Sequence, residues 1–127
     1  MQRVATKQTR APNAAEKRFL KWTKEQPCIV TGLRVPVIAH HCWGSAAKRK
    51  VDLISTLIGP WAVIPLSKTV DDVITLGSRR RFEQQYGPQI RYLMRHIASY
   101  PDRQQIPLSV LNAFIGMAKE AGEWHPE

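Results

Sequence analysis

Two pairs of residues have side chains that could do chemistry together, His40-His41 and, later in the chain, Asp71-Asp72. An imidazole can act as a general base near neutral pH, and carboxylate oxygens suit Mg²⁺ or Mn²⁺. Hydrolysis of a phosphodiester uses both, because a base deprotonates water while a divalent cation stabilises the developing charge. If the chain brings the two pairs to one point, it has the groups that this reaction requires.

Both pairs also have interpretations without chemistry. His40-His41 can be ordinary histidines at the end of a strand, and Asp71-Asp72 can be charges in the first turns of a helix, where the helix dipole favours them. A zinc site made of Cys28, Cys42 and the two histidines is disfavoured, because three adjacent residues give poor tetrahedral geometry. The residues alone leave the first two alternatives open.

The elements expected around the histidines are strands. Residues 28–30 and 35–39 are predicted to form a hairpin, joined by a turn at 31–34 in which Gly32 can take a positive φ. The hairpin would end at His40-His41. Residues 61–65 form a further apolar segment, expected as a strand or an extended run.

A short helix over residues 67–74, capped by Ser67 or Thr69, would carry the aspartates. A hairpin followed by a helix is a ββα arrangement, expected over about residues 28–77. If the strand end and the helix face each other, imidazole and carboxylate converge.

Helices are expected on both sides of this unit. Asn13 predicts the N-cap of a helix over 14–24, which ends before Pro27. Helical patterns recur over 78–85, 89–99 and 108–121. The predicted fold class is α+β: a flexible basic arm over 1–13, then one domain over 14–127 with an N-terminal helix, the ββα unit and a helical cap over 78–121.

Charge is the strongest signal in the composition. The 19 Lys and Arg against 10 Asp and Glu give a net charge of +9. Seven cations and one anion lie in residues 1–24, and two clusters follow at Lys48–Lys50 and Arg79–Arg81. Such a distribution favours contact with nucleic acid through phosphates. Plain solubility, with Arg79–Arg81 as a solvated face, is the alternative.

The remaining composition narrows the class of protein. No apolar run approaches the roughly 18 residues of a membrane span, and no apolar segment follows the basic N-terminus as in a secretory signal. We therefore expect a cytoplasmic protein with no membrane partner. Two cysteines are too few for a disulfide scaffold, so reduced thiols are expected for Cys28 and Cys42, and spacing alone permits a bond between them.

Three segments together resemble a known family: VIAHHCWGS at 37–45, WAVIPL at 61–66 and GSRRRFEQQYG at 77–87. They are similar to the HNH, or His-Me finger, nucleases of phages and prophages, and most of all to the group of RecA-dependent phage recombination nucleases. The similarity covers roughly residues 16–88. In that family a His-His or Asp-His pair ends the hairpin, and a Pro-Leu segment precedes the helix of the ββα unit.

The resemblance implies a metal-dependent DNA endonuclease of low sequence specificity, acting in recombination or DNA processing in the host cytoplasm. His41 matches the general base and His40 the neighbouring position that contacts the metal. Asp71 or Asp72 lies where the helix would supply the second ligand for Mg²⁺ or Mn²⁺.

The expected partners are DNA, whether single-stranded, branched or duplex, and a host or phage recombination protein. Basic residues of the arm, a charged loop and a helix start would hold the DNA backbone, and Trp43 could stack on a base. The expected DNA-binding residues are Arg10, Lys17, Trp43, Lys48, Arg49, Lys50, Arg79, Arg80 and Arg81.

The chain also departs from the family. Many relatives hold a structural zinc with two CxxC pairs, and the matching positions here are Cys28 with Thr31 and Ser67 with Val70. One thiolate cannot hold zinc, so no structural zinc is expected. No histidine follows His41 until His96 in the helical cap, so a helix His ligand is missing. Two other interpretations therefore stay open: an inactive relic that binds DNA or a host repair protein, and a basic structural protein outside the family.

Overall fold

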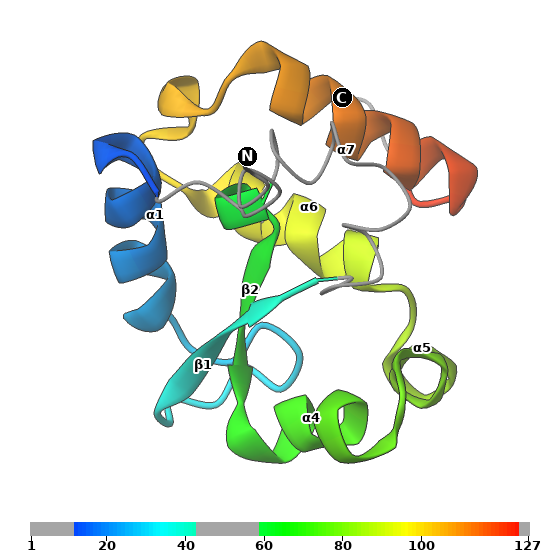
Figure 1. The fold of residues 1–127 in the computed structure, drawn as a ribbon. Helices are drawn as coiled ribbons and strands as arrows, with labels where there is room; N and C mark the ends of the chain where they lie inside the picture. Colours follow the sequence, from blue (N-terminus) through cyan, green and yellow to red (C-terminus); the bar gives the residue numbers. More distant parts are fainter. Residues whose placement is uncertain (1–11, 43–58, 125–127) are drawn as a thin grey trace, which may run out of the picture.

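The computed structural model describes residues 12–42 and 59–124, and its elements are helices arranged around a small sheet (Figure 1). In chain order these are α1 (Ala14–Lys24), β1 (Val37–His41), a 3-10 turn (Gly59–Trp61), β2 (Val63–Ser67), α4 (Lys68–Asp72) continued by a π-helical turn (Val73–Gly77), α5 (Arg79–Tyr86), α6 (Gln89–Ser99), a 3-10 turn (Arg103–Gln105) and α7 (Leu108–Glu120). The predicted α+β class is confirmed.

The sheet consists of two antiparallel strands that are distant in the sequence. Val37 lies opposite Ser67, and His41 lies opposite Val63. Every residue of β2 is buried, while β1 has only half-buried and exposed positions. β2 is therefore the central strand of the core, and β1 lies at its edge with one face toward solvent.

β2 runs directly into α4 without a loop. Ser67 is both the last residue of the strand and the N-cap of the helix, and its Oγ accepts a hydrogen bond from the backbone N–H of Val70. This cap satisfies one of the free donors of the first turn. Of the two predicted caps, Ser67 and Thr69, the structure has Ser67, which fixes where α4 begins relative to the sheet.

The predicted hairpin of residues 28–30 and 35–39 is wrong. Residues 29–31 form a turn instead, closed by the hydrogen bond from the backbone N–H of Gly32 to the carbonyl oxygen of Cys28, with Gly32 at φ 76°. The backbone N–H of Ile29 donates to the carbonyl of Pro65, which ties the turn to β2. β1 begins only at Val37, because Pro36 has no N–H to donate to a ladder.

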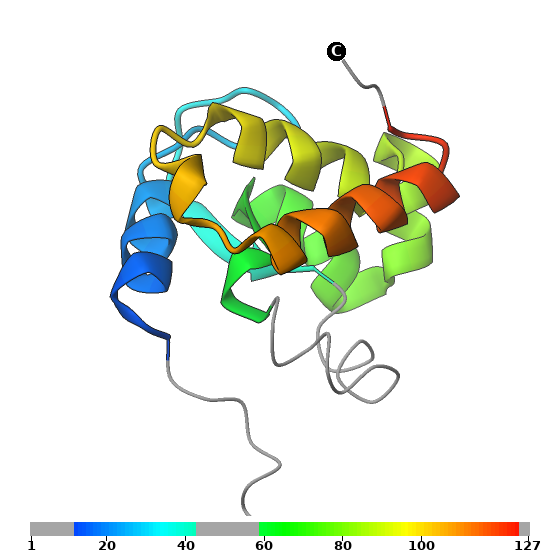
Figure 2. The same cartoon turned by 90° about the horizontal axis from the view of Figure 1, so that it is seen from above.

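The core joins all the helices to β2. Phe19 of α1 lies 5.2 Å from the ring of Trp61, and both are buried. α6 and α7 pack side by side, as Figure 2 shows, and contribute Leu93 and Phe114 to the same core. Burial of these large apolar side chains is the main stabilising term of such a fold. Within residues 12–42 and 59–124, no helix is long and apolar enough to cross a membrane.

Candidate functional site

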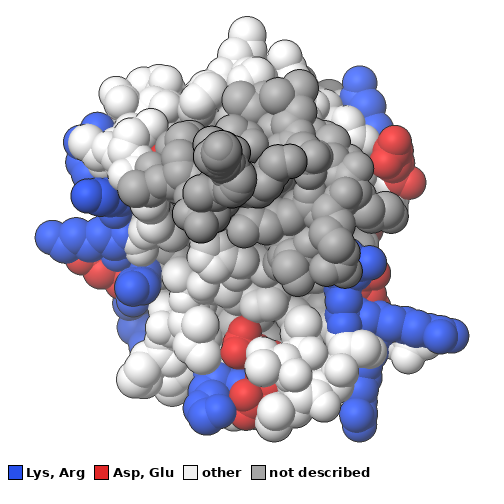
Figure 3. All heavy atoms as spheres, viewed as in Figure 1, with Lys and Arg blue, Asp and Glu red and all other residues white. Residues whose placement is uncertain are grey.

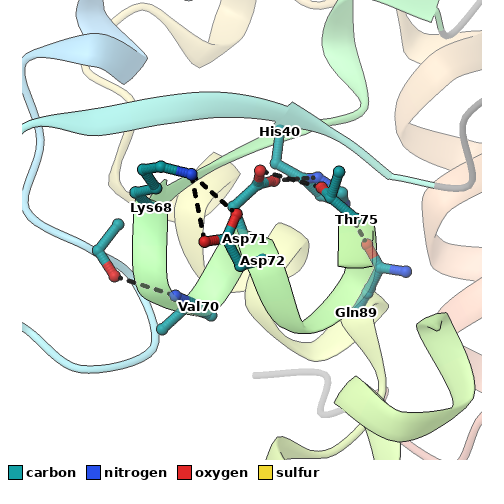
Figure 4. A network of polar contacts seen from close by, with 8 residues as sticks. His40, Lys68, Val70, Asp71, Asp72, Thr75 and Gln89 are labelled. Carbon is teal, nitrogen blue, oxygen red and sulfur yellow. Dashed lines mark hydrogen bonds and ion pairs between the residues drawn. The ribbon is translucent and has the colours of Figure 1, made fainter. Parts of the chain in front are cut away.

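The imidazole of His40 and the carboxylate of Asp71 meet beside the sheet, with Nδ1 3.0 Å from Oδ1 (Figure 4). His40 comes from β1 and Asp71 from α4, which follows the partner strand β2. The two side chains are only 12% and 13% exposed. The contact is therefore largely shielded from water.

Two further residues extend this contact into a chain. The second ring nitrogen of His40, Nε2, lies 3.0 Å from Oε1 of Gln89, the first residue of α6. The hydroxyl of Thr75 donates to the other carboxylate oxygen of Asp71 at 3.1 Å. Both ring nitrogens of His40 and both oxygens of Asp71 therefore have partners, so the pair is held in one geometry.

Neither Thr75 nor Gln89 was expected at this site from the sequence. Thr75 stands four positions after Asp71, so it shares a helical face with it, and this spacing could have revealed it. Gln89 gives no local signal, because its contact with His40 joins residues 49 positions apart in the chain.

Asp72, the other predicted metal ligand, makes a different contact. Nζ of Lys68 lies 3.2 Å from each of its carboxylate oxygens, in an i,i+4 pair on the helix surface. The structure thus brings Asp71 to His40 and directs Asp72 toward Lys68.

His41, the predicted general base, is the last residue of β1 and is exposed. Neighbouring residues of a strand project to opposite faces of the sheet. His40 therefore faces α4, and His41 faces the other way. The two imidazoles do not meet in one cluster.

The pair fits two neighbouring ligands of one divalent cation. Mg²⁺ prefers oxygen ligands and binds them at about 2.1 Å in octahedral geometry, which puts adjacent ligand atoms about 3.0 Å apart. The separation of His40 Nδ1 and Asp71 Oδ1 has this value. Within residues 12–42 and 59–124, no three His, Cys, Asp or Glu side chains form a metal-binding group. The pair would thus leave the other positions to water or phosphate oxygens.

Basic side chains lie on two sides of this site. Arg79, Arg80 and Arg81 are exposed at the start of α5, where the hydroxyl of Ser78 accepts a hydrogen bond from the backbone N–H of Arg81. Lys17 is exposed on α1. Figure 3 shows Lys and Arg gathered over α1 and over α5, with acidic side chains over α4 between them. Arg10, Trp43, Lys48, Arg49 and Lys50 lie outside the described residues.

Cys28 lies beside the other positions that match a zinc knuckle in the family. Burial raises the pKa of its thiol, but hydrogen bonds from the Thr31 hydroxyl and from the backbone of Ser67, Thr31 and Val30 outweigh it and bring the pKa to about 7. Polar contacts from Thr31 and Ser67 thus surround the single remaining sulfur. Burial raises the pKa of Cys42, and both thiols are free, as predicted.

Comparison of the chain with protein-family models, with curated proteins and with solved structures finds no match in any of the three.

Proposed function

We propose that this protein is a DNA-binding protein of the HNH type and acts as a metal-dependent endonuclease. The observation that carries the proposal is the shielded contact between His40 and Asp71, 3.0 Å apart. Two antiparallel strands lead directly into the helix that supplies Asp71, in the order that a ββα unit would have. This order supports the resemblance to His-Me finger nucleases.

In the proposed site His40 and Asp71 would hold Mg²⁺ or Mn²⁺. The bound cation would supply positive charge to the phosphate and to the leaving oxygen. The family resemblance assigns the general base to His41, which is exposed at the end of β1 and faces away from His40, so its imidazole would have to turn toward the cation to take a proton from water. Gln89 and Thr75 hold the two ligands in place from outside the site.

The charge of the protein supports DNA as the substrate. The net charge is +9, and the cations over α1 and α5 lie on either side of the acidic α4. Two separated basic surfaces can hold the phosphate backbone on both sides of a cleavage point. Contacts of this kind do not read bases, so sequence specificity would be low. A place in phage recombination or DNA processing in the host cytoplasm follows from the family resemblance alone.

Nicking of supercoiled plasmid tests the proposal. Wild-type protein and the His41→Ala variant are compared in Mg²⁺ and in Mn²⁺, with EDTA controls and with single-stranded circles as a second substrate. We expect nicking that requires the cation and is lost in the variant. Equal nicking by both proteins would remove His41 from the mechanism.

A second candidate is an inactive protein that has kept the fold and binds DNA or a recombination protein. One observation favours it: Asp71 and Gln89 occupy both ring nitrogens of His40, so a cation must displace one of these contacts. This candidate predicts no nicking by the wild type, together with DNA binding that weakens steeply as salt is added.

A further inference from the structure

Gln89 is a polar residue in the buried interior of the protein, where a polar side chain needs a hydrogen-bond partner. Its side chain is 1% exposed, at the first position of α6. A buried amide costs free energy unless it is hydrogen-bonded. Its Oε1 lies 3.0 Å from Nε2 of His40. The next residue, Ile90, is buried in the core and anchors this end of α6, so Gln89 approaches His40 from a fixed helix.

The contact with Gln89 bears on which nitrogen of His40 carries the proton when a cation is bound. A neutral imidazole has one N–H donor and one lone pair, and the partner of one nitrogen sets the role of the other. Oε1 of Gln89 and Oδ1 of Asp71 can both only accept, so each contact favours an N–H on the ring nitrogen that faces it. A cation bound by Nδ1 and Asp71 would take the place of the proton on Nδ1, and the N–H of the ring is then on Nε2, where Gln89 accepts it.

We propose that Gln89 is a positioning residue for His40: by accepting the Nε2–H, it holds the ring proton at Nε2 when Nδ1 binds a divalent cation together with Asp71. Histidines that bind metals commonly donate their other N–H to an oxygen acceptor, which fixes both the tautomer and the ring orientation. The inference rests on the proposed function, because it takes His40 and Asp71 as the cation site. The inference gives the helical cap, through Gln89 of α6, a role in positioning a ligand of that site.

The test is the affinity for Mn²⁺, measured by titration calorimetry on the full chain. Gln89→Met keeps the length of the side chain and removes the acceptor. Loss of such an outer partner typically weakens metal affinity about 10- to 100-fold, and we expect this for Gln89→Met. Gln84→Met changes an exposed glutamine of α5 and serves as the matched control, with wild-type affinity expected. Gln89→Glu restores an acceptor oxygen and is expected to recover most of the loss.

A measurement on the wild type does not depend on how the variants fold. With Mg²⁺ bound, nitrogen-15 spectra of the histidine rings should show the proton of His40 on Nε2. A proton on Nδ1 would overturn the inference, and so would a Gln89→Met variant with unchanged Mn²⁺ affinity. A wild-type protein that binds no Mn²⁺ would also overturn the inference.

A failure of the role of Gln89 and a failure of the proposed nuclease function would give different results. Metal-dependent nicking that needs His41, combined with unchanged affinity in Gln89→Met, would overturn the role of Gln89 and leave the nuclease standing. Weakened Mn²⁺ binding in Gln89→Met, without nicking by the wild type, would support the role of Gln89 in a cation site that does not cut DNA.

Discussion

His40 and Asp71 are 31 positions apart in the chain, yet Nδ1 of one lies 3.0 Å from Oδ1 of the other. The contact exists because β1 pairs with β2 and because β2 passes into α4 at Ser67 with no intervening loop. A single strand register therefore sets the position of Asp71 relative to His40. A slip of one residue would turn His40 to the other face of the sheet.

The neighbouring aspartates provide a matched pair of variants. Asp71→Ala removes the carboxylate that meets His40, and we expect Mn²⁺ affinity to fall at least about 10- to 100-fold, with metal-dependent nicking lost. Asp72→Ala removes a surface partner of Lys68, so affinity should stay near wild type and stability should change by at most about 1 kcal/mol. Calorimetry and the plasmid assay measure both effects. Equal losses in the two variants would contradict the assignment of Asp71.

The helices could be predicted from the sequence because their signals are local. Asn13 caps α1, and the hydroxyl of Ser78 caps α5. The pairing of β1 with β2 was not predicted, because the two strands are distant in the sequence: His41 lies opposite Val63, 22 positions later. The apolar run at residues 28–30 has strand propensity, but Gly32 closes it into a turn, and turn geometry overrides propensity.

The same division between local and distant contacts holds for the site. The sequence predicted that an imidazole and a carboxylate converge if the strand end faces the helix, and His40 and Asp71 do meet. The sequence did not distinguish Asp71 from Asp72, since the two differ only in the direction in which α4 presents them. Gln89 was missed because a glutamine at the start of a helix has many surface roles, and its burial depends on how α6 packs against the sheet.

The arginines at the start of α5 should contribute to DNA binding through phosphates. The logarithm of the binding constant falls with the logarithm of salt concentration by about 0.9 per phosphate contact on duplex DNA. Arg80→Gln should therefore reduce this slope by up to about 0.9, and the triple change of Arg79, Arg80 and Arg81 by up to about 3. Fluorescence anisotropy of a labelled duplex at several salt concentrations measures the slope. Lys119→Gln, on α7, is the control. An equal reduction of the slope in this variant would indicate that net charge alone sets the salt dependence.

His96 should make stability depend on pH. It is buried against the rings of Phe19 and Trp22, with Nε2 2.9 Å from the hydroxyl of Thr23, and burial lowers its pKa to about 4. Between this value and the ordinary pKa of about 6.5, the unfolded chain binds a proton that the folded protein does not. The free energy of unfolding should thus fall as pH drops through this window, by about 3 kcal/mol in all.

Urea denaturation at several pH values across this window measures the loss. The control is His96→Phe combined with Thr23→Val, which keeps an aromatic ring in the core and leaves no unpaired hydroxyl. The other titratable groups are common to both proteins, so the difference between the two pH curves isolates His96. Parallel curves would show that His96 does not lose its charge on folding.

Two glycines should respond to alanine with opposite signs. Gly87 ends α5 at φ 99° and ψ 175°, a region that residues with a side chain avoid, and an added Cβ would lie 2.7 Å from Cζ of Arg91. Arg91 is held there by bonds to Glu123 and to the carbonyl of Tyr86, so it cannot move away freely. We expect Gly87→Ala to destabilise the protein by about 1–3 kcal/mol. Gly116 lies within α7 with open space around it, so Gly116→Ala should stabilise by about 0.5–1 kcal/mol. Urea midpoints that shift in the same direction for both variants would contradict the backbone conformation at Gly87.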